Sequence, residues 1–157
     1  MTPSIDPDRL WRSIMDLAEI GPTPEGGSCR LALSPEDAAA RGLFADWCRQ
    51  PGLAPERDAI GNMFARRAGT DPGAGAIAFG SHLDIVPTGG RFDGVFGVLA
   101  GLEVMRALHE AGVRTRAPLE LVNWTNEEGS RFAPAMMGSR VFAGTLPLET
   151  ALATTDA

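Results

Sequence analysis

The feature that most constrains the fold is a strand–helix–strand pattern in the middle of the chain. Residues 76–80 (AIAFG) and 118–125 (PLELVNWT) are short apolar runs, and residues 94–112 between them carry apolar side chains at helical spacing. This order is typical of a βαβ unit, in which the two strands run parallel and the crossover is right-handed. The sequence therefore predicts an α/β fold: a mixed sheet with a βαβ core and flanking helices.

The first fifty residues predict two of the flanking helices. Asp6 and Pro7 open an amphipathic helix that Gly21 closes. Ser34 and Pro35 open a second helix with acidic residues in its first turn. Between them, residues 21–27 (GPTPEGG) are rich in helix and strand breakers and predict a loop.

The remaining elements are shorter. Residues 53–67 contain two extended pieces around DAIGN, which predicts a hairpin or a bent strand pair. Residues 126–140 are predicted as a loop that leads into a short helix, and residues 146–157 as the start of another helix.

Composition and charge exclude several classes of protein. A chain of 157 residues with 44% hydrophobic and 22% charged residues suits one globular domain with a real core. The net charge of -6 argues against nucleic acid or an anionic membrane as a partner. The most apolar segment is interrupted by Glu103, so no membrane span is predicted.

The chain start and the cysteines bear on location. The first ten residues lack a basic region followed by an apolar one, which argues against a secretory signal. Cys29 and Cys48 are isolated and lack a CxxC spacing, so we expect free thiols in a reducing compartment. The prediction is a cytoplasmic domain.

Polar residues gather where the two central strands end. His82 and Asp84 follow the first strand, Asp93 precedes the crossover helix, and Glu127 and Glu128 follow the second strand. Because the carboxyl ends of parallel strands meet at one edge of a sheet, we expect these side chains to lie close together. For His82 alone an ordinary loop or core histidine is the favoured interpretation, and for the glutamates a solvated acidic pair. The convergence of all of them favours a metal site.

These residue types suit hydrolytic metal chemistry. Imidazole and carboxylates are common ligands of Zn²⁺, Mn²⁺ and Co²⁺, and a carboxylate can bridge two ions. Asp93 is the natural bridge, and Asp84 can steady the His82 ring from behind. If residues 126–129 are extended, the side chains of Glu127 and Glu128 diverge, so that one binds metal while the other faces water as a general base.

Two stretches, GSHLDIVPTGGRFDGVFGVLAGLEV and WTNEEGSRFAPAMMGS, resemble the bimetallic amidohydrolases of the M20 peptidase superfamily. They resemble most the branch of N-carbamoyl-L-amino acid hydrolases, allantoate amidohydrolases and β-ureidopropionases, as do CRLALSPEDAAAR and DAIGNMFARRAG. The resemblance implies a zinc-peptidase-like catalytic domain with two divalent ions (Zn, Mn, Co or Ni). It implies hydrolysis of a non-peptide C–N bond in a ureido compound, with amino acid, CO₂ and ammonia as products. Ile85 departs from the Thr or Ser more usual in the family.

Carried over residue by residue, the resemblance makes His82 a ligand of one metal, Asp93 the bridge and Glu128 a ligand of the other. Glu127 becomes the general base, and Asp84 supports the site from behind the ligands. Family members also use two further histidines downstream, whereas the other histidine of this chain, His109, lies upstream in the predicted helix.

The family also carries a lid or dimerisation domain that this sequence lacks. Residues 1–157 are therefore predicted to be the N-terminal part of the catalytic domain, without its C-terminal part, of an enzyme that is a homodimer at full length. The main prediction is a carbamoylase, with allantoate amidohydrolase or β-ureidopropionase as alternatives. A non-catalytic truncated fragment is a further alternative, and an aminopeptidase or deacylase is less favoured. Arg91 and Arg131 are either contacts for a substrate carboxylate or partners of nearby acids.

Overall fold

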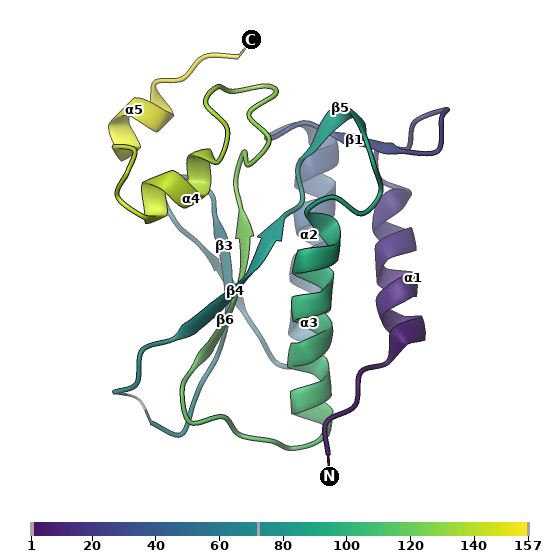
Figure 1. The fold of residues 1–157 in the computed structure, drawn as a ribbon, viewed down its shortest axis with the longest axis vertical. Helices are drawn as coiled ribbons and strands as arrows, with labels where there is room; N and C mark the ends of the chain where they lie inside the picture. Colours follow the sequence, from purple (N-terminus) through teal and green to yellow (C-terminus); the bar gives the residue numbers. More distant parts are fainter. Residues whose placement is uncertain (1, 72, 157) are drawn as a thin grey trace.

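A four-stranded mixed sheet forms the centre of the computed structural model, which describes residues 2–71 and 73–156 (Figure 1). Its strand order is β2-β3-β6-β4, where β2 is Pro55–Arg57, β3 Met63–Arg67, β4 Ile77–His82 and β6 Leu119–Trp124. β4 and β6 are parallel, in register from Ile77 opposite Leu119 to His82 opposite Trp124. The other two pairs are antiparallel. The predicted mixed sheet and its parallel βαβ pair are confirmed.

Three helices cover one side of this sheet in Figure 1: α1 (Pro7–Ala18), α2 (Pro35–Arg49) and α3 (Val95–Glu110). Asp6 and Ser34 are the N-caps of the first two, and each accepts a hydrogen bond from a backbone N–H of the first turn, as predicted. α3 connects β4 to β6 and packs against both. The main core lies between helices and sheet and includes Leu17, Phe44, Leu83, Leu102 and Leu121.

One pair of strands was not predicted. β1 (Ser28–Arg30) and β5 (Ile85–Gly89) form a separate antiparallel pair beyond the carboxyl ends of β4 and β6 (Figure 1). Glycine and proline residues around both strands indicated loops. The structure pairs the two segments instead, because Gly27 and Gly89 have no side chains and let the two backbones approach closely. A Cβ on Gly27 would lie 2.4 Å from the carbonyl oxygen of Gly89.

The C-terminal part carries two short helices beside that edge, α4 (Met137–Phe142) and α5 (Leu148–Leu152). α4 is the short helix predicted after the loop. The prediction that residues 146–157 begin a further helix is only partly right, because α5 ends at Leu152 and the described residues after it are not helical. Among residues 2–71 and 73–156, no helix combines the length and apolar character that crossing a bilayer requires.

Candidate metal centre

His82 is the last residue of β4, and its imidazole is held from behind. The ring is buried, and Nδ1 lies 2.9 Å from the backbone carbonyl oxygen of Asp84. A carbonyl only accepts, so Nδ1 carries the proton and donates, which leaves the lone pair of Nε2 for the site. Asp84 does steady the ring, but through its carbonyl: its carboxylate oxygen Oδ1 lies 3.8 Å from Nδ1.

Asp93 lies on the loop that enters α3, next to a glycine that packs against the histidine. Gly94 has φ +64°, and a Cβ there would lie 2.5 Å from ring atoms of His82. The absence of a side chain at Gly94 therefore lets the loop press against the imidazole and bring Asp93 beside it. The carboxylate of Asp93 is exposed and stands at the N-terminal end of α3, where the helix dipole favours negative charge.

Glu127 and Glu128 lie on the loop after β6. Asn126 has φ +51°, so the backbone turns here, and the extended geometry on which the expected divergence of the two glutamates was conditional is not found. Both glutamates face the histidine instead of diverging: Oε2 of Glu127 is 3.3 Å from Nε2 of His82, and Glu128 shares a cluster with that ring. The backbone N–H of Glu128 donates to Oδ2 of Asp84 at 3.2 Å, which ties the two segments together.

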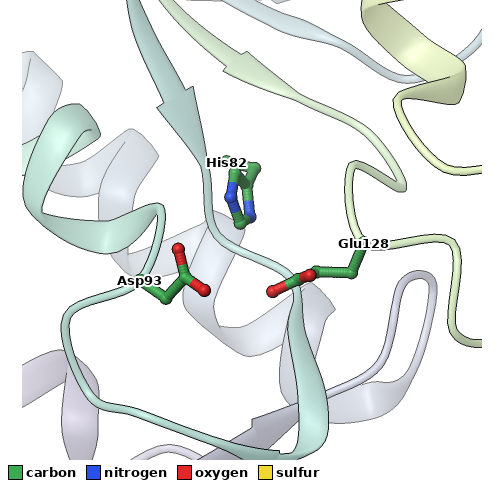
Figure 2. Close-up of side chains that lie close together, drawn as sticks. All are labelled: His82, Asp93 and Glu128. Carbon is green, nitrogen blue, oxygen red and sulfur yellow. The ribbon is translucent and has the colours of Figure 1, made fainter.

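Figure 2 shows how His82, Asp93 and Glu128 converge, with the two carboxylates directed toward each other beneath the ring. One ligand atom from each of these residues lies within 4.8 Å of the others. The structure thus brings these three sequence-distant segments together at one sheet edge, as the sequence predicts.

The electrostatics of this cluster fit a cation. Burial, followed by the charges of Asp93, Glu127 and Asp84, raises the pKa of Glu128 against the opposing effect of His82. Burial also raises the pKa of Asp84. Among residues 2–71 and 73–156, Oε1 of Glu128 and Oδ1 of Asp84 are buried without a hydrogen-bond partner, and Nε2 of His82 lies 3.3 Å from a carboxylate oxygen of Glu127. A divalent ion would relieve the repulsion and give Glu128 Oε1 a partner, so the residues present fit the metal that the sequence predicts.

The arginines, the second histidine and the cysteines considered in the sequence lie outside this cluster. Arg131 makes two hydrogen bonds to the carboxylate of Asp156, and Arg91 donates to the carbonyl of Gly26. The contact of Arg131 agrees with the interpretation of this arginine as a partner of a nearby acid, whereas Arg91 bonds to a backbone carbonyl and not to an acid. His109 is exposed in the last turn of α3, about 20 Å along the helix from the cluster. Cys29 and Cys48 are free thiols, as predicted.

Sequence reasoning missed two buried polar residues that support the site. Arg30 is 1% exposed and donates through Nε to the carbonyl of Leu83, between His82 and Asp84. Asn62 is fully buried and bonds to the first residue of the loop that carries the glutamates. The asparagine of the predicted DAIGN turn was a weak signal for the role of Asn62. Nothing in the sequence pattern marks Arg30 as a residue that supports the site.

A buried histidine and two carboxylates at the carboxyl edge of parallel strands form a candidate metal site in an α/β domain. Residues 78–154 match the sequence profile of peptidase family M20/M25/M40. The chain belongs to this family.

The similar proteins include several amidohydrolases. The chain is 51% identical over 152 residues to an N-carbamoyl-L-amino-acid amidohydrolase of Rhizobium meliloti, covering 97% of this chain and 36% of that protein. It is 35% identical to a ureidoglycolate hydrolase of Arabidopsis thaliana, covering 97% of this chain and 32% of the relative. The crystal structure of a hydantoinase/carbamoylase family amidase from Burkholderia ambifaria superposes with a TM-score of 0.96 at 61% identity, over 99% of this chain and 38% of that one. The chain thus spans about a third of the length of the relatives it matches.

Proposed function

We propose that this chain provides the metal-binding part of a hydrolase that cleaves a linear, non-peptide C–N bond, with the carbamoyl group of an N-carbamoyl-L-amino acid as substrate. The observation that carries the proposal is the convergence of His82, Asp93 and Glu128, with Glu127 beside them. The similarity to proteins named N-carbamoyl-L-amino-acid amidohydrolase supports the substrate.

Each residue of the cluster has a part in this proposal. His82 and Glu128 would each be a ligand of a divalent ion, and Asp93 would be a ligand shared by both ions. When bound, the ions supply positive charge that favours ionisation of water and polarises a carbonyl group. Asp84 keeps the His82 ring oriented through its carbonyl and the Glu128 backbone in place through its carboxylate.

Glu127 is the proton carrier. It takes a proton from the attacking water and returns it to the leaving nitrogen, as a carboxylate beside the cluster can. The ureido group and one water thereby yield the amino acid and carbamic acid, and the latter divides into CO₂ and ammonia.

The proposal includes the place of this chain in a larger protein. We infer that residues 1–157 are the N-terminal part of the catalytic domain, and that further ligands, a lid and a dimer contact lie in the rest of a longer polypeptide. The threefold greater length of the relatives supports this. An intact mass of the native polypeptide well above 16.5 kDa would agree with it, whereas a mass of 16.5 kDa would favour the non-catalytic fragment.

A second candidate substrate is another small ureido compound. The relatives named ureidoglycolate hydrolase favour it, because they match at 35–39% identity over nearly the whole chain. Relative kcat/KM for N-carbamoyl amino acids, allantoate and ureidoglycolate separates these alternatives.

The test is the Glu127→Gln variant of the native polypeptide, assayed for ammonia release in Mn²⁺ or Co²⁺. We expect metal binding to persist and kcat to fall by roughly 10²- to 10⁴-fold, since the carboxamide cannot accept the proton. His82→Ala should instead weaken metal binding itself. Turnover that survives in Glu127→Gln would remove Glu127 from this role.

A further inference from the structure

The loop of residues 125–138, which carries both glutamates, is closed at its neck by backbone hydrogen bonds. The N–H of Gly138 donates to the carbonyl of Thr125 at 2.9 Å, and the N–H of Met137 to that of Asn126 at 3.1 Å. The outgoing and returning backbones therefore pair briefly where the loop leaves β6 and enters α4.

One further bridge at this neck comes from outside the loop. Oδ1 of Asn62 accepts from the N–H of Thr125 at 2.9 Å, and Nδ2 of Asn62 donates to the carbonyl of Gly138 at 3.0 Å. The side-chain amide thus joins the two strands of the neck as a backbone peptide group would.

Asn62 is itself fixed in place. It is fully buried, and Asp58 accepts from both its backbone N–H and its Nδ2, each at 2.8 Å. With acceptors for both protons of Nδ2 and a donor for Oδ1, the amide has one orientation that satisfies it.

The neck has no room for a side chain at residue 138 beside this amide. A Cβ on Gly138 would lie 2.1 Å from Oδ1 of Asn62 and 2.7 Å from the backbone nitrogen of Thr125. The glycine and the asparagine therefore fit each other.

We propose that Asn62 is a positioning residue of the metal centre: by clamping Thr125 to Gly138 it sets where Glu127 and Glu128 stand relative to His82. Glu127 and Glu128 follow Thr125 by two and three residues, so a displaced neck moves both carboxylates. The metal part of this inference rests on the proposed function, whereas the clamp does not.

The clamp is tested by hydrogen exchange on the metal-free chain. In the wild type, we expect the amide of Thr125 to be protected, and in Asn62→Ala exchange across residues 125–128 to rise by about tenfold, the effect of one lost buried hydrogen bond. Gly138→Ala, which pushes the amide out from the other side, should raise it too. Asn123→Ala is the matched control: that asparagine is equally buried in β6, but its Nδ2 reaches only the Met63 sulfur, at 3.7 Å.

The positioning role is tested by Co²⁺ titration at a temperature where each variant is fully folded. We expect Asn62→Ala to bind Co²⁺ about 10- to 100-fold more weakly than the wild type, and Asn123→Ala to bind it as the wild type does. A purely structural role would lower the melting temperature of both variants and leave the Co²⁺ affinity of both unchanged.

The outcomes separate the two proposals. Unprotected Thr125 in the wild type, or unchanged exchange in both clamp variants, overturns the clamp even if Asn62→Ala does not fold. Increased exchange with unchanged Co²⁺ affinity overturns the positioning role alone. A native full-length polypeptide that binds no Co²⁺ overturns the metal centre and the positioning role together, while exchange still decides the clamp.

Discussion

The two segments that carry the candidate ligands are held in place by different means. The segment from β4 to α3, with His82 and Asp93, rests on the apolar core: Leu83, Ile85 and Val95 are fully buried. The loop of residues 125–138 packs against a smaller apolar cluster, in which its own Met137 meets Leu146 and Ala151, and it also depends on polar contacts. Packing fixes the first segment, and a few hydrogen bonds fix the second, so changes of different kinds should disturb each.

The largest effect is expected from Gly94→Ala, which attacks the packed segment. The new Cβ would lie 2.5 Å from the imidazole, and φ is +64°, so either the ring or the α3 entrance must move. We expect Co²⁺ affinity to fall by about 100-fold, measured by titration.

Gly112→Ala is the matched control for that variant. Gly112 has φ +65° and open space around its Cβ position, so it carries the same backbone strain without the clash. Equal losses of Co²⁺ affinity in both variants would show that strain, and not contact with His82, is responsible.

The next effect concerns the charge buried under the packed segment. Arg30 donates to the carbonyls of Leu83, Leu17 and Ile20, and burial lowers its pKa to about 10 against the opposing charges of Asp37 and Asp84. Arg30→Met keeps much of the volume but leaves three carbonyls without this donor. We expect the free energy of unfolding to fall by about 2 kcal/mol in a urea titration. An unchanged midpoint would mean that the cost of burying the charge equals the gain from its hydrogen bonds.

A smaller and opposite effect is expected at Asp84, which links the two segments. Burial raises its pKa above the ordinary value of 3.8, so the folded chain binds this proton more tightly than the unfolded chain does. The stability that this proton confers is complete below the ordinary value and is lost as the pH rises through the folded pKa. At neutral pH the ionised carboxylate therefore destabilises the metal-free fold.

Asp84→Asn should accordingly stabilise the metal-free chain at neutral pH by about 1 kcal/mol while weakening Co²⁺ binding. Its Oδ1 can still accept from the N–H of Glu128. Thermal melts between pH 4 and pH 8 measure the effect, with the exposed Asp46→Asn as control. A variant less stable than the wild type at neutral pH would contradict this reasoning.

The same contrast explains what could be predicted from the sequence. The β4–α3–β6 unit follows from apolar periodicity, which is local, and parallel pairing then brings His82 and the residues after Trp124 to one edge. The Asn62 clamp, the Arg30 contact and the β1–β5 pair join residues more than fifty positions apart through single polar or glycine contacts, which leave no periodic trace. Asn126, in the same closed loop, has a left-handed φ, so the condition of an extended backbone on which the divergence of the two glutamates depended is not met.

The smallest expected effect is on the reactivity of the Cys48 thiol, which tests whether the two segments open independently. Its thiol belongs to the same apolar core as Leu83 and Val95, and burial raises its pKa to about 12. Since the thiolate is the reactive form, iodoacetamide at pH 8 should modify Cys29, which is only half-buried, and spare Cys48 until guanidinium unfolds the chain.

Mass spectrometry of the labelled peptides then distinguishes the variants. Asn62→Ala should leave Cys48 unmodified, because the loop of residues 125–138 can loosen without opening the core. Leu83→Ala, which removes a fully buried side chain beside His82, should expose it to slow labelling. Labelling of Cys48 in Asn62→Ala at the rate seen in Leu83→Ala would mean that both segments open as one cooperative unit, and the contrast between packing and polar clamping would not describe this site.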